Sequence, residues 1–139
     1  MPATTYTLNK VLDYIFGETA YTPSIAATYY FGLSSSLMDA TGSLTGELSG
    51  GSYARKSFPN NKAASGWGDA AAGALSNDGA LTFIESTADW GTILAIFIAD
   101  TDVEGAGNVL WYYNLNPTLT VGDNTIVSFP VGTVMASMT

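Results

Sequence analysis

The sequence contains no cysteine and no histidine among its 139 residues. The lack of cysteine excludes disulfide frameworks, thiol catalysis and thiolate metal sites, and it fits a reducing compartment. The lack of histidine removes the commonest general base and the commonest neutral metal ligand, so Ser-His-Asp chemistry is impossible. Neither a Ser-Lys arrangement nor a phosphate-binding glycine loop is recognisable. We therefore predict a protein without catalytic residues and without cofactors.

Charged residues are also scarce, at 12% of the chain, which is about half the usual share of ~25%. Four basic residues face twelve acidic ones, for a formal net charge of -8. Phosphate backbones and anionic membrane surfaces repel such a chain, so we predict neither a nucleic-acid nor a membrane partner. No apolar run approaches the roughly 20 residues of a membrane-spanning helix. No secretory signal is visible at the N-terminus, and we expect release by another route, such as lysis.

The length predicts a single domain over residues 1–139. Near its start, apolar residues recur with the 3.6-residue period of an amphipathic helix over about residues 7–16, with Thr7 as the N-cap. The apolar stripe consists of Leu8, Val11, Leu12, Ile15 and Phe16. The favoured interpretation is that this stripe covers the domain's own sheet, and the alternative is a docking face for a neighbouring subunit.

From about residue 28 onward, short β-type segments alternate with turn signals. This pattern predicts an all-β fold, an antiparallel sandwich or jelly-roll-like barrel with one N-terminal amphipathic helix. Residues 119–121 and 125–129 flank a Gly-Asp-Asn turn and are predicted to form a hairpin. The other predicted strands are 28–35, 53–58, 80–83, 93–99, 109–115 and 133–138.

Residues 93–99 are apolar at every position, so a strand here needs cover on both faces, from its own fold or from another subunit. Together with the low charge, this pattern predicts that more than one copy is needed to bury the segment. Residues 36–52 are rich in Gly, Ser and Thr and are expected to form a long loop. We expect that loop to lie across a neighbour or to point outward.

Two groups of carboxylates are candidate sites. The first matches positions 1, 3, 5 and 6 of a calcium loop: Asp100, Asp102, Glu104 and Gly105. Position 12 of that loop is Trp111 instead of glutamate, so a solvated acidic loop is the favoured interpretation. The second group, Glu85 with Asp89, has the composition of a glycosidase pair, but a pair across a turn is more often two surface charges.

Six segments, taken in order, resemble a family of small tailed-bacteriophage virion proteins that are often labelled tail fibre or minor structural proteins. The segments read LDYIFGETAYT, YYFGLSSS, GGSYARKSF, STADWGTILAIFIAD, NVLWYYNL and VGDNTIVSFPVGT. The resemblance implies a non-enzymatic, β-rich virion component, tail-fibre-like or a capsid decoration protein, that multimerises on the particle. Its implied partners are other virion proteins and copies of itself, as a homotrimer or a larger assembly.

The contacts between copies are predicted to come from the helix stripe and from large residues of the β segments. These residues are Leu8, Val11, Leu12, Ile15, Trp67, Trp90, Ile93, Phe97, Trp111 and Tyr113. The alternative function is a carbohydrate-binding module that recognises host surface glycans through aromatic rings. Trp67, which stands between two glycines, suits either an interface anchor or a ligand platform.

Overall fold

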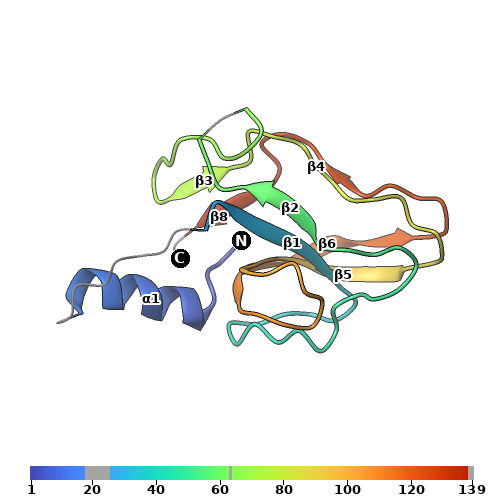
Figure 1. Cartoon of the computed structure of the whole chain (residues 1–139), viewed down its shortest axis with the longest axis horizontal. Coiled ribbons are helices and arrows are strands. Elements are labelled where there is room, and N and C mark those ends of the chain that lie inside the picture. Colours follow the sequence, from blue (N-terminus) through green and yellow to red (C-terminus); the bar gives the residue numbers. More distant parts are fainter. Residues whose placement is uncertain (18–25, 63, 138–139) are drawn as a thin grey trace.

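A computed structural model describes residues 1–17, 26–62 and 64–137. Within them the chain forms one N-terminal helix followed by short strands (Figure 1). The elements are α1 (Thr5–Phe16), β1 (Thr28–Ser34), β2 (Lys56–Pro59), β3 (Ala74–Ser76), β4 (Leu81–Thr82), β5 (Gly91–Ala99), β6 (Val109–Val121), β7 (Ser128–Phe129) and β8 (Met135–Ser137). The prediction of a mostly β chain with one N-terminal helix is confirmed.

The first turn of α1 is fixed to the start of β6 by two threonines. Thr4 is the N-cap, and its hydroxyl accepts a hydrogen bond from the Thr7 backbone N–H and donates one to the Val109 carbonyl at 2.6 Å. The Thr7 hydroxyl donates to the Leu110 carbonyl at 2.8 Å. The predicted N-cap, Thr7, is therefore wrong by one turn, because its side chain contacts β6 while Thr4 closes the helix end. At the other end, Gly17 is the C-cap, and its backbone N–H donates to the Asp13 carbonyl at 2.8 Å.

The strands form three antiparallel sheets. The largest has four strands in the order β2-β1-β5-β6, and two-stranded sheets are formed by β3 with β8 and by β4 with β7. In the part of the chain that the structure describes, none of these sheets closes on itself, because β2 and β6 are the two opposite edges of the large sheet. The barrel form of the fold prediction is therefore wrong.

The predicted hairpin between residues 119–121 and 125–129 does not form. Residues 119–121 belong to β6 and pair with β5, with Gly91 opposite Val121. β7 pairs with β4 instead, with Leu81 opposite Phe129. The Gly-Asp-Asn turn is real, but long-range pairing with β5 decides the strand partner, which a local turn signal does not encode.

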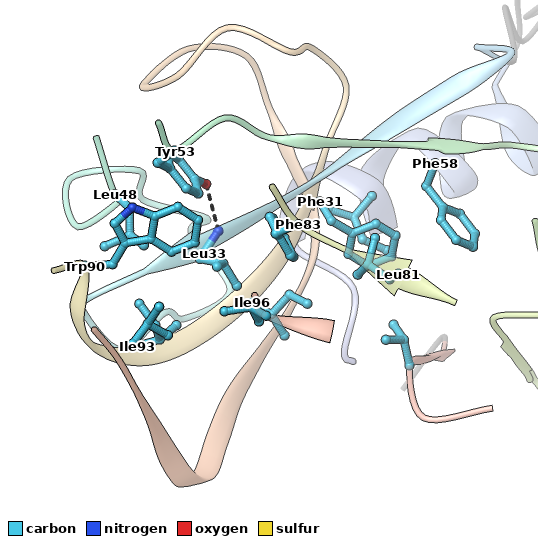
Figure 2. Close-up of a cluster of buried hydrophobic side chains, with 14 of the residues drawn as sticks. Phe31, Leu33, Leu48, Tyr53, Phe58, Leu81, Phe83, Trp90, Ile93 and Ile96 are labelled. Carbon is cyan, nitrogen blue, oxygen red and sulfur yellow. Dashed lines mark hydrogen bonds between the residues drawn. The ribbon is translucent and has the colours of Figure 1, made fainter. Parts of the chain in front are cut away.

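The main hydrophobic core lies on one face of the four-stranded sheet, against the two small sheets (Figure 2). Aromatic rings meet edge to face in it: the Phe31 and Phe58 centroids are 5.4 Å apart, and those of Phe58 and Trp67 are 5.2 Å apart. Such pairs add about 0.5–1.5 kcal/mol beyond the area they bury. Other members are Leu33, Leu48, Tyr53, Leu81, Phe83, Trp90, Ile93, Ile96, Ile98, Leu110, Val121, Val127, Val134 and Ala136.

The opposite face of the sheet carries a second cluster centred on Phe97. Ala95, Phe97 and Ala99 alternate with the residues of β5 that face the main core. Their cover comes from residues 36–52 of the same chain, which contribute Met38 and Leu44.

Two hydrogen bonds fix this cover to the sheet. The Met38 N–H donates to the Asn114 side-chain oxygen at 2.9 Å, and the Asn114 amide donates to the Met38 carbonyl at 2.9 Å. The expectation that a second copy is needed to bury residues 93–99 is wrong, because the long loop lies across its own sheet and not across a neighbour.

Candidate functional site

An ion pair is enclosed beside the second face of the sheet. Arg55 Nε lies 2.7 Å from Glu47 Oε1, and the side chains of Arg55 and Glu47 are 0% and 2% exposed. A second guanidinium nitrogen donates to Glu47 Oε2 at 2.7 Å, and the third donates to the Thr101 carbonyl at 2.7 Å. Glu47 Oε2 also accepts from the Gly105 N–H. The guanidinium carbon lies 5.3 Å from the centroid of the Phe97 ring.

We call this cluster the clasp: Glu47 and Arg55 with their partners Thr101 and Gly105. It joins residues 36–52, the residue before β2 and the connection between β5 and β6. Charge-assisted, bidentate pairing satisfies both ions, and solvent has almost no access to them. A substrate would have to displace these contacts to reach either group. The stretch with the densest positive charge in the sequence, residues 53–58, is therefore partly neutralised inside the protein and does not form a basic patch.

Tyr53 connects the clasp to the main core. Its hydroxyl accepts from the Leu33 N–H at 2.9 Å, drawn as the dashed line in Figure 2, and donates to Glu47 Oε1 at 3.3 Å. Burial raises the pKa of the Tyr53 phenol well above its ordinary value of 10.0, and the nearby Glu47 charge raises it further.

This raised pKa predicts alkaline destabilisation. Above about pH 10 the unfolded chain loses the Tyr53 proton while the folded protein keeps it, so stability falls by up to about 1.4 kcal/mol per pH unit. Urea unfolding from about pH 7 to about pH 12 should show a steeper loss in the wild type than in Tyr53→Phe. The variant should also lose about 1–3 kcal/mol at neutral pH, because the Leu33 N–H is left unpaired. Equal alkaline slopes in the two proteins would contradict the assignment.

The acidic candidates do not converge on a shared ligand position. Within residues 1–17, 26–62 and 64–137, no three acidic side chains gather closely enough to hold a metal ion. Both carboxylate oxygens of Asp100 accept hydrogen bonds from Asn108, from its backbone N–H and its side-chain amide. Asp102 and Glu104 are exposed. Asp100 therefore closes the connection between β5 and β6, and the calcium pattern is accounted for as loop structure.

The second carboxylate pair is also a surface feature. Glu85 and Asp89 are both exposed, and Asp89 accepts a hydrogen bond from the Gly91 N–H at 2.8 Å. Asp89 therefore holds the turn that leads into β5.

A cleft of about 470 Å³ opens between the small β3–β8 sheet and the adjoining ends of β1 and β2. This volume falls in the range of ligand and peptide-anchor sites. The wall is mostly apolar, and three aromatic rings contribute to it. The lining residues are Tyr29, Asn60, Asn61, Lys62, Trp67, Gly68, Ala70, Gly73, Ala74, Leu75, Ile98, Trp111, Ala136 and Ser137.

Many of the polar groups around the cleft are already bonded within the chain. Lys62 pairs with Asp69 at 2.9 Å on the rim, and this hydrogen bond and charge lower the pKa of Asp69. The Asn60 amide donates to the Ala26 carbonyl, and the Trp111 indole donates to the Ser137 carbonyl. The cleft therefore suits an apolar occupant better than a ligand that requires many hydrogen bonds.

Among the helices and strands that the structure describes, α1 carries the most exposed large apolar side chains. Leu12, Ile15 and Phe16 are 53%, 59% and 79% exposed. Only the first turns touch the sheet, since Thr7 is buried and Val11 is half-buried. Figure 1 shows α1 at one end of the long axis, extending away from the four-stranded sheet. The favoured prediction that the stripe covers the domain's own sheet is wrong for most of its length.

The predicted interface residues thus fall into three groups. Enclosed by the chain itself are Trp67, Trp90, Ile93 and Phe97. Half-buried are Val11 and Trp111. Exposed are Leu8, Leu12, Ile15 and Tyr113. Only the helix residues among them form one continuous surface.

The chain thus combines a self-contained β core, a closed ionic clasp and an apolar helix face that its own sheet leaves uncovered. The comparison with known families gives the class of the protein. The chain belongs to the Gp80 family, described as "Podophage GP4 fiber I protein gp80", whose pattern matches residues 2–137. It is therefore a structural, non-enzymatic phage fibre protein and a virion component. No curated protein matches the sequence.

The cleft and the clasp were not found from the sequence. Most of the cleft wall comes from residues 60–75, which show no period, and Trp67 was the one signal in that stretch. No pattern relates Glu47 to Arg55, since the pair depends on how the long loop folds back. In the part of the chain that the structure describes, no helix has the length and apolar character needed to cross a membrane.

Proposed function

We propose that this chain is a fibre subunit that associates with copies of itself, as a homotrimer or larger assembly, through the apolar face of α1. The observation that carries the proposal is the exposure of that face, with Leu12 and Ile15 more than half exposed. In proteins, a helix gains most of its stability from packing of its apolar stripe. Most of this stripe lacks cover from the chain's own sheet, and membership of a fibre family supports a neighbouring virion protein as the cover.

Surface charge supports the same location. Copies with a net charge of -8 repel one another over most of their surface. On α1 itself, Lys10 and Asp13 balance each other, so this element meets a neighbour without net repulsion. Lys10 also lies 5.8 Å from the centre of the Tyr6 ring, on the side of the helix away from the stripe. The stripe itself therefore carries no charge, and a scarcity of charged residues is what is expected at the core of an interface.

Replacing apolar residues of the α1 stripe with aspartate should weaken the association between copies. Each of these side chains contributes about 1.5–3 kcal/mol when buried, so Leu12→Asp with Ile15→Asp should weaken association at least about 100-fold. Light scattering during size exclusion should show an assembly for the wild type and a monomer for the variant. Circular dichroism should show an unchanged fold, because both side chains are more than half exposed in the single chain.

Tyr6→Asp is the matched control, since it adds the same charge to the opposite side of the same helix. It should leave the assembly intact. A wild type that stays monomeric at every concentration, or a double variant that assembles normally, would refute the proposal.

The alternative, a carbohydrate-binding module for host surface glycans, has weaker support. That interpretation depends on exposed aromatic rings, but Trp67 is 7% exposed and packs against Phe31 and Phe58. In β6, Trp111 and Tyr112 are half-buried, and Tyr113 is 46% exposed.

A further inference from the structure

A groove of about 360 Å³ lies between the second half of β6 and the segment that contains β7. Its walls come from residues 115–121 and 125–129, and the turn at residues 122–124 joins the two walls at one end. The volume lies at the lower end of the range of binding sites. We call it the β6–β7 groove. Much of its lining is apolar and comes from Leu115, Pro117, Leu119, Ile126 and Phe129.

One wall of the β6–β7 groove is a free strand edge. β7 pairs with β4, β6 pairs with β5, and no backbone hydrogen bond joins β7 to β6 in the part of the chain that the structure describes. The Thr125 and Val127 carbonyls accept from residues 86 and 83, just after β4. Because the backbone groups of successive strand residues point to opposite sides, those of Ile126 and Ser128 are directed away from β4 and toward the groove. An unpaired edge of this kind is where an extended peptide adds as a further strand.

The other wall offers apolar contact instead of backbone pairing. Near its start, β6 is already bonded on its outer side, where Ala3 bridges to Trp111. Farther along, Pro117 has no backbone N–H, so this part of β6 cannot donate a regular ladder to an added strand. Leu119 is exposed and lines the groove. An added strand would therefore bond to β7 and place apolar side chains against β6.

The closed end of the β6–β7 groove is acidic. Asp123 lies in the turn that joins the walls. Glu85 and Asp89 precede residues 86 and 90, whose backbone N–H groups donate to the carbonyls of residues 125 and 121 on the two walls. All three carboxylates are exposed, and in the described structure no ion pair joins any of them to a cation of the chain. The four basic residues lie elsewhere: Lys10 on α1, Arg55 in the clasp, Lys56 on β2 at the opposite edge of the large sheet, and Lys62 beside Asp69.

This charge identifies the kind of partner. A second copy has a net charge of -8 and would be repelled, whereas lysine or arginine on an extended segment would be attracted to the closed end. We propose that the β6–β7 groove binds an extended segment of another protein as an added strand along β7. That segment alternates apolar side chains and carries lysine or arginine. The inference goes beyond the proposed function, since it concerns a different surface and a partner other than a second copy.

A library of random peptides tests the proposal. Peptides of about seven residues, at about 3.3 Å each, span the longer wall. They are selected on the wild-type chain and counter-selected on Ile126→Arg, which puts a long cationic side chain in the groove. The retained peptides should alternate apolar residues and contain lysine or arginine. Fluorescence anisotropy should show at least about tenfold weaker binding to Ile126→Arg than to the wild type. Val103→Arg is the matched control and should bind normally, since Val103 is 57% exposed against 56% for Ile126 but lies between β5 and β6.

Neutral variants test the role of the acidic end. Glu85→Gln with Asp123→Asn removes two charges and keeps the size of both side chains. Binding of the selected peptides should weaken at least about fivefold at low salt, with little difference at high salt. Asp102→Asn with Glu104→Gln removes the same charges from the exposed β5–β6 connection and should leave binding unchanged.

Methylation of the peptide backbone tests strand addition itself. A selected peptide is methylated on its nitrogens at alternate positions, in either of the two possible sets. The set that faces β7 should weaken binding at least about tenfold, and the other set should have little effect. Equal tolerance of both sets would overturn strand addition.

Other results would also overturn the inference. A library that yields no peptide sensitive to Ile126→Arg would show that the groove takes no extended segment. Neutral or acidic selected peptides would contradict the assigned partner. Loss of the light-scattering assembly in Ile126→Arg, with no peptide selected, would assign the groove to a second copy. The proposed function is tested separately, since Leu12→Asp with Ile15→Asp changes α1 alone and should bind the selected peptides as the wild type does.

Discussion

Replacing Glu47 with alanine is expected to lower the free energy of unfolding by about 3–5 kcal/mol, because it leaves the Arg55 guanidinium buried without its partner. The substitution also removes the acceptor for the Gly105 N–H, so the β5–β6 connection loses its hold on the long loop. Urea unfolding followed by tryptophan fluorescence measures the loss. Trp90 is a suitable reporter, since its indole donates to the Gly51 carbonyl, close to the same loop.

Two further variants distinguish a buried pair from an ordinary surface ion pair. Lys62→Ala removes an ion pair of similar length, but there both side chains are mostly exposed, at 71% and 87%. That loss should be much smaller than the loss in Glu47→Ala, because solvent screens exposed charges. The double variant Glu47→Leu with Arg55→Met replaces both ions by apolar groups and should be more stable than Glu47→Ala. A Glu47→Ala loss no larger than that of Lys62→Ala would contradict the role of the clasp.

Phe97→Ala should cost about 3–5 kcal/mol, the usual range for removing a buried aromatic ring. The ring is 0% exposed and is the only large aromatic side chain in the second cluster's fully buried set. It lies directly on the backbone of β1, where Gly32 pairs with it across the strands. A Cβ atom at position 32 would lie 2.2 Å from the tip of the ring, so the glycine is required by the ring.

A double-mutant cycle tests that requirement. Gly32→Ala alone should destabilise by about 1–3 kcal/mol through overpacking. In the Phe97→Ala background, the added methyl enters the vacated space, and the same change should have almost no further effect. Gly122→Ala, where a Cβ meets no atom within 4 Å, is the matched control and should be near neutral. Additive losses at positions 32 and 97 would show that the ring and the glycine do not share this space.

The elements with a strong local period were predictable. The helix ends at Phe16 as its apolar stripe indicates, and β1 begins at Thr28 where alternation begins. Strand partners were not predictable in the same way. Residues 119–121 pair with β5 and not with the segment after the next turn, because pairing depends on the packing of residues far apart in the chain.

β5 is apolar on both faces, and its own sequence does not show which residues pack against those faces. Residues 93–99 do need both faces covered, as the sequence indicates. The cover on the second face is Met38 and Leu44, which stand in a Gly- and Ser-rich stretch with no amphipathic period. Two separated apolar residues carry too little signal to predict that the loop folds back. The same limit applies to Glu47 and Arg55, whose pairing depends on that fold.

The apolar stripe of α1 was predictable from the sequence, but what packs against the stripe was not. Periodicity shows which side of α1 is apolar, and says nothing of what lies against it. The hydrogen bonds of Thr4 and Thr7 to β6 set the direction of the helix, and direction decides that Leu12 and Ile15 remain exposed.

Because residues 36–52 cover Phe97 within the same chain, a single copy already has a closed hydrophobic core. If subunits associate as proposed, each copy can therefore join the particle already folded. Heavier and lighter isotope-labelled copies, mixed after assembly, should accordingly exchange places without passing through an unfolded state.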